Sequence, residues 1–202
     1  WGHDIKGVPA VKGTIVLARN NFHGPTTTII SFSNDVAARR GFGPYTPGFR
    51  SVPFGDADAM TAAIDDDTVA VLIEPIQGEA GIIVPPDDYL PGLRAILKKH
   101  GVLLIADEVM AGWGRTGAWF SVNHWNVEPD ILVTGKGLSG GLYPIAATVL
   151  SERVAGWRAG HPGPCAAPPG ASPGRLRWAG VRVSRCRRRR RVRDRSGSIR
   201  AF

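Results

Sequence analysis

The chain has 202 residues, with 25 lysines and arginines against 17 aspartates and glutamates, and its formal net charge is +8. Residues 1–155 contain 12 basic and 16 acidic residues, so the positive charge belongs to the C-terminal part and says nothing about what the rest binds. Both cysteines, Cys165 and Cys186, also lie in that part, which excludes a disulfide scaffold, a cysteine-ligated zinc site and a cysteine nucleophile from the rest, and we expect no metal site.

Short runs of β-branched and aliphatic residues predict a series of strands. In chain order the predicted strands cover residues 14–18, 69–73, 102–106, 131–134 and 144–150. Residues 88–100 predict a helix, because apolar residues recur at helical spacing and two lysines precede Gly101 at its end. The predicted strands are continuously apolar, as expected when helices cover both faces of a sheet.

The alternation of strands and helix indicates an α/β fold with a mostly parallel sheet, in which ligands bind beyond the carboxyl ends of the strands. Several polar or aromatic residues follow those ends directly, and they are the candidates for a site: Phe22, His23, residues 74–79, Asp107, Glu108 and Lys136.

Lys136 lies in the stretch ILVTGKGLSGGLYP, at the end of a predicted buried strand and among glycines that allow sharp bends. One interpretation is a surface lysine in a turn. The other is an amine held in a site, where burial lowers its pKa and makes it available for Schiff-base chemistry.

Asp107 ends the strand in LLIADEVMAGWGRTG, and a carboxylate there needs a partner because an unpaired buried charge is costly. It could cap a helix, pair with Arg115, or hold a protonated ring nitrogen. Together with Lys136 on the next strand, the last possibility matches the needs of pyridoxal phosphate, which uses a lysine and an aspartate in this way.

Three stretches, EPIQGEAG, ADEVMAGWGRTG and GKGLSGGLYP, closely resemble the class III pyridoxal-phosphate aminotransferases in order and spacing. Within that class, WGHDIKG, NNFHG, GFGPYTPGF and EPIQGEAGIIVP are most similar to the ornithine aminotransferases. The resemblance covers residues 1 to about 157. It implies that residues 1–157 are a partial pyridoxal-phosphate-binding large domain of fold type I, with a mostly parallel sheet flanked by helices.

The resemblance also implies roles for five residues. Lys136 matches the Schiff-base lysine, which then acts as the catalytic base. Asp107 matches the aspartate that bonds the ring nitrogen, while Val109 and Phe22 match the residues on the two ring faces. Glu79 matches a glutamate that pairs with an arginine and admits ω-amino substrates.

The implied activity is transfer of the ω-amino group of ornithine to a 2-oxo acid. The alternatives are an ω-amino acid:pyruvate or an acetylornithine aminotransferase, or another reaction of the same class. Pro25 stands where ornithine and acetylornithine enzymes carry a carboxylate-binding arginine, so we expect weak ornithine binding. The resemblance further implies a homodimer and a longer enzyme, and we expect this chain alone to be inactive.

Residues 158–202 are rich in Arg, Pro and Gly and lack an amphipathic period, which predicts disorder. They could form a nucleic-acid-binding arm on an inactive scaffold, or be GC-rich coding sequence read out of frame. The abrupt change near Trp157 favours the second, and we expect no nucleic-acid partner. Since no apolar run approaches ~20 residues, we expect no membrane span and a cytoplasmic location.

Overall fold

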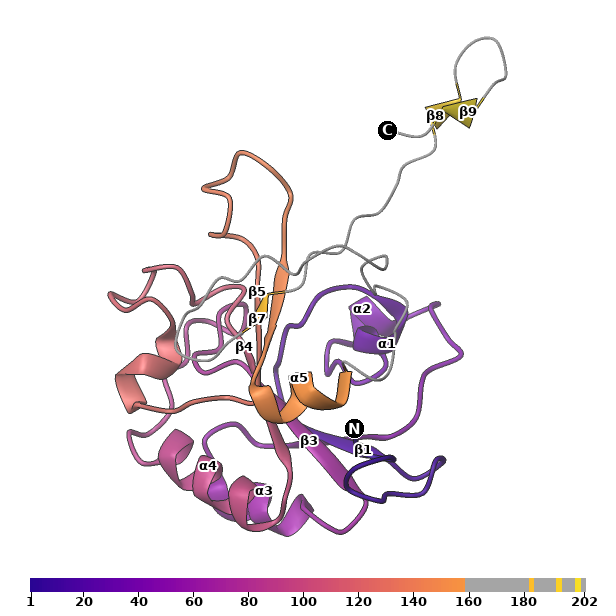
Figure 1. Cartoon of the computed structure of the whole chain (residues 1–202), viewed down its shortest axis with the longest axis vertical. Coiled ribbons are helices and arrows are strands. Elements are labelled where there is room, and N and C mark those ends of the chain that lie inside the picture. Colours follow the sequence, from indigo (N-terminus) through magenta and orange to yellow (C-terminus); the bar gives the residue numbers. More distant parts are fainter. Residues whose placement is uncertain (159–181, 184–191, 194–198, 201–202) are drawn as a thin grey trace.

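The computed structural model describes residues 1–158, 182–183, 192–193 and 199–200. Its main sheet has seven strands in the order β2-β1-β3-β4-β5-β6-β7 (Figure 1). The strands are β1 (Thr14–Ala18), β2 (Phe49–Val52), β3 (Thr68–Ile73), β4 (Leu103–Asp107), β5 (Ile131–Thr134), β6 (Ala147–Leu150) and β7 (Arg182–Val183). A separate pair, β8 (Val192–Arg193) and β9 (Ile199–Arg200), is antiparallel.

The helices are short apart from one. They are α1 (Thr27–Ile30), α2 (Val36–Arg39), α3 (Ala57–Ala63), α4 (Tyr89–Lys99), the 3₁₀ helix η1 (Ser121–Trp125) and α5 (Glu152–Arg158). Among the helices that the structure describes, none combines the length and the apolar character needed to cross a bilayer.

Five of the strands are parallel, as predicted. Strand β1 pairs in parallel with β2 and β3, β3 with β4, and β4 with β5. Strand β6 covers less than the predicted 144–150 and runs antiparallel to β5, because residues 135–146 turn the chain back directly without a crossover helix. Parallel strands joined by crossovers are the pattern that brings strand ends together at one edge.

Side chains of the central strands alternate between two apolar layers. Val71 and Leu104 face a core built with residues of α3 and α4, which lie side by side in Figure 1. Ala70 and Leu103 face the other layer, where Val154 of α5 is buried. The prediction that both faces of the sheet are covered is confirmed for these central strands.

Helix α4 lies within one residue of the predicted helix at each end. Leu90, Leu93 and Leu97 are fully buried, so the predicted apolar stripe faces the core. Arg94, on the same helix, donates to Asp130 with 2.6 Å between Nη1 and Oδ2. The same Asp130 oxygen accepts from the Leu104 amide, which ties α4 to the sheet.

The predicted disorder of residues 158–202 and the nucleic-acid arm fall largely outside the described residues. Within that range the structure describes Arg158 and strands β7, β8 and β9. Both hypotheses about this segment therefore remain predictions.

Candidate active site

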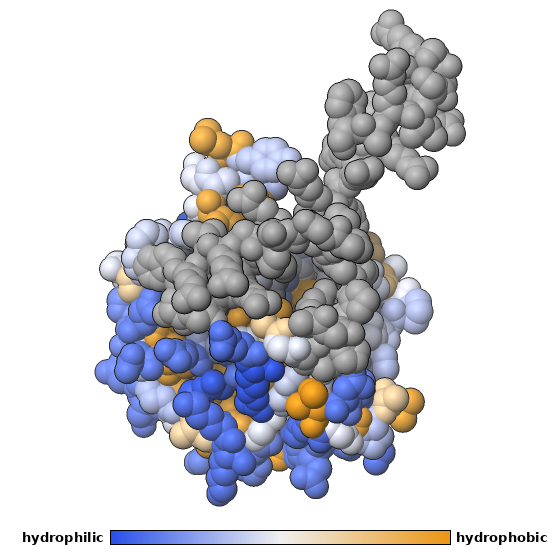
Figure 2. All heavy atoms as spheres, viewed as in Figure 1, coloured by the Kyte–Doolittle hydropathy of each residue, from blue (hydrophilic) through white to orange (hydrophobic). Residues whose placement is uncertain are grey.

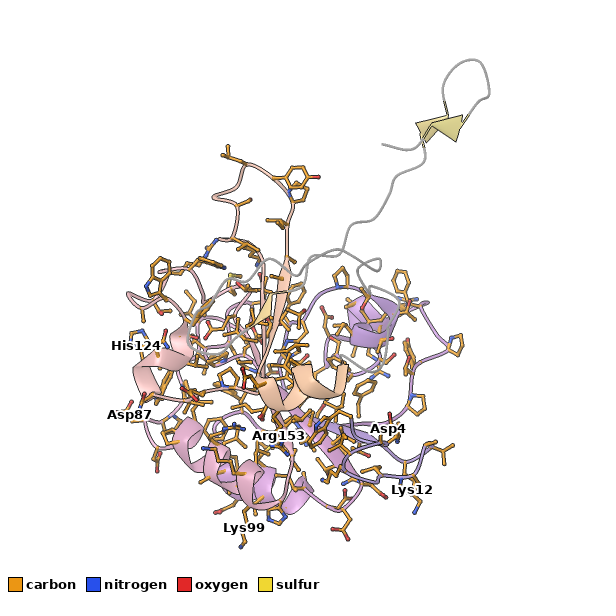
Figure 3. All side chains as sticks on the ribbon, in the orientation of Figure 1. Asp4, Lys12, Asp87, Lys99, His124 and Arg153 are labelled. Atoms are coloured by element: carbon orange, nitrogen blue, oxygen red, sulfur yellow. The ribbon has the colours of Figure 1, made fainter. Side chains whose placement is uncertain are left out.

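The candidate residues follow the carboxyl ends of four neighbouring parallel strands. Phe22 follows β1, Glu79 follows β3, Asp107 ends β4 and Lys136 follows β5. Figure 3 labels residues at the opposite edge, including Lys99 at the end of α4 and Lys12 just before β1. The candidates therefore gather at one edge of the sheet, where parallel α/β sheets bind ligands.

Asp107 is 8% exposed and makes two hydrogen bonds through different oxygens. Its Oδ2 lies 2.7 Å from Nδ1 of His23, and its Oδ1 accepts from the Val109 amide at 2.9 Å. The His23 ring is buried, and its second nitrogen, Nε2, has no hydrogen-bond partner among the described residues. His23 was not among the partners that the sequence analysis considered for Asp107, and neither of the two hydrogen bonds of Asp107 involves Arg115.

Glu74, the first residue after β3, is 4% exposed. Its Oε2 accepts from the Phe22 amide at 3.0 Å and its Oε1 from the Gly78 amide at 3.3 Å. Burial raises the pKa of Glu74 above its usual value, and the two amide donors oppose that rise. One buried carboxylate thus holds the loop after β1 and the loop after β3.

Lys136 is 41% exposed at its side chain, so the described residues leave the amine open to solvent. Its Nζ lies 3.7 Å from Oε1 of Glu79 and 3.4 Å from Sδ of Met110. Of the two interpretations of Lys136, the one that held the amine in a site expected burial, and this degree of exposure differs from that expectation. The contact with Glu79 brings together two residues that the resemblance had paired with different partners.

The glycines beside Lys136 make room for the loop after β4. A Cβ atom on Gly137 would lie 2.6 Å from Cβ of Trp113. Trp113 in turn donates from Nε1 to Oγ1 of Thr134, the last residue of β5. A Cβ on Gly135 would be in ordinary contact with Val109, which places Val109 next to the lysine segment.

A cavity of about 480 Å³ lies beside two of the candidate residues, Phe22 and Glu79, and its lining does not include Asp107 or Lys136. Phe22, Pro25, Phe42 and Glu79 are among its lining residues, together with several asparagines. Among the described residues that line it, none is lysine or arginine. Phe22 is 50% exposed, so its ring has an open face.

The chain that joins β5 to β6 projects from the same edge of the sheet. Its tip carries orange, hydrophobic atoms next to paler ones in Figure 2, and Leu142 and Tyr143 of this segment are exposed. Lys136 lies at the start of the same segment, directly after Gly135.

The structure also shows polar residues whose roles the sequence analysis missed. His23 and Glu74 were candidates by position alone, without partners. Glu108 is fully buried, and its carboxylate accepts from the Ser121 hydroxyl at 2.8 Å and the Val122 amide at 2.9 Å, at the start of η1. For the two glutamates the available signal was a carboxylate directly after a buried strand, since Glu74 follows β3 and Glu108 follows β4.

Residues 2–165 match the family Aminotransferase class-III. The chain belongs to the class III aminotransferases. Members of this family share the observed α/β architecture, and the predicted fold class is confirmed.

Named relatives give a more detailed comparison. The chain is 47% identical over 156 residues to the ornithine aminotransferase of Bordetella pertussis, an alignment that covers 77% of this chain and 38% of the relative. The chain therefore spans well under half the length of that curated relative.

At least two solved aminotransferase structures are similar to this chain. One is the ornithine aminotransferase of Toxoplasma gondii with partial occupancy of PLP at its active site, with a TM-score of 0.72 and 39% identity over 73% of this chain and 35% of that chain. The other is the acetylornithine aminotransferase of Elizabethkingia anophelis, with a TM-score of 0.63 and 43% identity over 77% of this chain and 38% of that chain.

Proposed function

We propose that this chain is the part of a pyridoxal-phosphate-dependent aminotransferase that carries the reactive lysine. The observation that carries the proposal is the position of Lys136. It lies two residues after the end of β5, one strand away from the buried carboxylate of Asp107 at the end of β4. A lysine and an aspartate at neighbouring strand ends are the two groups that pyridoxal phosphate requires of a protein.

The described residues fit this cofactor. Asp107 uses one acceptor position on each oxygen, and a carboxylate oxygen has a further lone pair for a ring N–H donor. Lys136 contacts only Glu79 and Met110 through its amine among the described residues, which leaves the amine free to react. Phe22 and Val109 supply apolar surface for a flat ring.

Bound pyridoxal phosphate supplies an aldehyde that amines can join and a ring that accepts electrons. Lys136 would hold the cofactor through Nζ and, once an incoming amine releases it, would take the proton from the substrate carbon that bears the amine and deliver it to the former aldehyde carbon of the cofactor. Glu79 lies close enough to stabilise the protonated lysine between those events. Asp107 would keep the ring nitrogen protonated, with His23 holding the carboxylate in place.

The amino donor that we propose is ornithine, through its ω-amino group, with a 2-oxo acid as acceptor. The Bordetella pertussis relative and the Toxoplasma gondii structure are both ornithine aminotransferases. The acetylornithine aminotransferase among the similar structures supports acetylornithine as the alternative donor. A cavity wall that combines Glu79 with apolar Phe22 suits a chain that ends in an amine.

A homodimer is part of the same proposal. The exposed tip between β5 and β6 supports it, because the large side chains of Leu142 and Tyr143 are left unburied there. A cytoplasmic location remains an expectation from the sequence.

An absorbance titration with pyridoxal phosphate tests the proposed function. The unaltered chain should give a saturable visible band that Lys136→Ala abolishes and Lys99→Ala retains. Lys99 is a suitable control because it lies on α4 at the opposite edge of the sheet (Figure 3). An equal band from Lys136→Ala would contradict the proposal.

A further inference from the structure

The carboxylate of Glu74 joins two loops that are far apart in the sequence. Its two oxygens accept from the amides of Phe22, 52 residues away, and of Gly78 in its own loop. Phe22 lines the cavity, and Gly78 is followed by Glu79, whose carboxylate lies 3.7 Å from the Lys136 amine. Both loops therefore carry a residue of the candidate site.

A second buried side chain links the same loops. Gln77 is 1% exposed, and its Nε2 donates to the Arg19 carbonyl at 2.8 Å. The backbone of Gln77 also exchanges two hydrogen bonds with Ile83, which closes the loop after β3 into a small hairpin. Because these hydrogen bonds restrict the loop after β3, the position of Glu79 depends more closely on that of Glu74.

We infer that Glu74 is a positioning residue, which fixes Phe22 and Glu79 relative to Lys136. The inference rests on the proposed function, because it concerns the residues that would surround the cofactor. A carboxylate that served only to satisfy the end of β3 would need donors from its own loop alone. Oε2 of Glu74 instead accepts from Phe22 in the loop after β1. The relative position of the two loops therefore depends on the Glu74 side chain.

Glu74→Gln tests the inference because the amide has nearly the same shape but only one acceptor oxygen. The matched control is Glu108→Gln, since Glu108 is also a buried glutamate whose two oxygens accept two donors, and these belong to η1 instead. Hydrogen exchange of the Phe22 and Gly78 amides is measured first, in the chain without cofactor. In Glu74→Gln we expect at least one of these two amides to exchange about tenfold faster or more. This factor corresponds to the loss of about one hydrogen bond to a charged group.

The Val122 amide serves as an internal reference, because it is bound by Glu108 and should keep its exchange rate in Glu74→Gln. This reference holds even if Glu108→Gln fails to fold. Unchanged exchange at Phe22 and Gly78 in Glu74→Gln would overturn the inference whatever the cofactor does.

The second measurement is pyridoxal phosphate binding, with visible circular dichroism at saturating cofactor. We expect Glu74→Gln to weaken binding by at least about fivefold and to alter the dichroism of the bound cofactor, which a general loss of stability would leave unchanged at saturation. Binding and dichroism equal to those of the unaltered chain would overturn the positioning role. If the unaltered chain binds no cofactor, the proposed function is contradicted, and amide exchange alone then decides whether Glu74 joins the loops.

Discussion

The Nδ1 atom of His23 lies 2.7 Å from Oδ2 of Asp107, and both side chains are almost fully buried. The two residues come from the ends of different strands, β1 and β4, and are 84 positions apart in the chain. A buried carboxylate with this short contact and a second donor, the Val109 amide, is held in one orientation. It can therefore present the same free lone pairs to any ring bound beside it.

This contact predicts that His23 and Asp107 are energetically coupled. His23→Ala or Asp107→Asn should each reduce the free energy of unfolding by about 1–3 kcal/mol, because each leaves a buried polar partner unsatisfied. The double variant should lose less than the sum, with a coupling of about 0.5–3 kcal/mol in urea unfolding. Strictly additive losses would show that the two side chains do not depend on each other.

A second prediction concerns the space beside Lys136. Gly137→Ala should lower the free energy of unfolding by about 1–3 kcal/mol, since the added methyl would overlap Cβ of Trp113. Gly92→Ala in α4 is the control, because nothing lies within 4 Å of its Cβ position, and it should stabilise the helix by about 0.5–1 kcal/mol. Equal effects of the two changes in thermal unfolding would contradict the predicted overlap.

Buried carboxylates predict how stability depends on pH. Burial raises the pKa of Glu108 above its usual value of 4.5, against hydrogen bonds from Val122 and Ser121. The folded state therefore binds the proton of the Glu108 carboxyl more tightly than the unfolded state does. The stability that this protonation adds is fully present below pH 4.5 and is lost as the pH rises through the pKa of the folded state. Glu74 acts in the same direction.

The free energy of unfolding should therefore fall as the pH rises above 4.5, by at most about 1.4 kcal/mol per pH unit for each group. Glu108→Gln should remove one of these contributions and leave a shallower pH dependence in urea unfolding. The same slope in the variant and the unaltered chain would show that Glu108 does not titrate differently on folding.

The cavity beside Phe22 predicts a change in donor preference. Pro25→Arg should improve ornithine binding to the chain loaded with pyridoxal phosphate by about 1.5–3 kcal/mol, the range for a hydrogen bond to a charged group. Pro9→Arg adds the same charge at an exposed position before β1 and should change nothing. Equal ornithine affinities of the two variants in calorimetry would favour the ω-amino acid:pyruvate type of aminotransferase over the ornithine type.

Local patterns were sufficient to predict the central strands and the long helix. Residues 14–18 and 131–134 form strands with the predicted bounds, because a continuous aliphatic run is the signal of a buried parallel strand. Strand β2 was not predicted, because Phe49–Val52 lies at the edge of the sheet and contains an arginine and a serine, which interrupt the apolar run. Arg50 is held by Asp65 at 2.6 Å, a contact with no local sequence signal.

For the candidate site, sequence placed Asp107 and Lys136 at strand ends but could not choose their partners. The contact between His23 and Asp107 depends on which strands are neighbours, and the Glu74 contact with Phe22 depends on how two loops fold back. Such pairings across 84 and 52 residues follow from the sheet order, which no local period encodes. The exposure of Lys136 likewise depends on what packs around its loop.

Reductive trapping tests the central claim, that Lys136 is the residue which binds pyridoxal phosphate. The chain is incubated with the cofactor, reduced with borohydride and digested, and the modified lysine is located by mass spectrometry. We expect the pyridoxyl group on Lys136, whose amine is accessible and lies beside Glu79 at the carboxyl edge of the sheet. Modification spread equally over Lys6, Lys12, Lys98 and Lys99, or absent from Lys136, would contradict it.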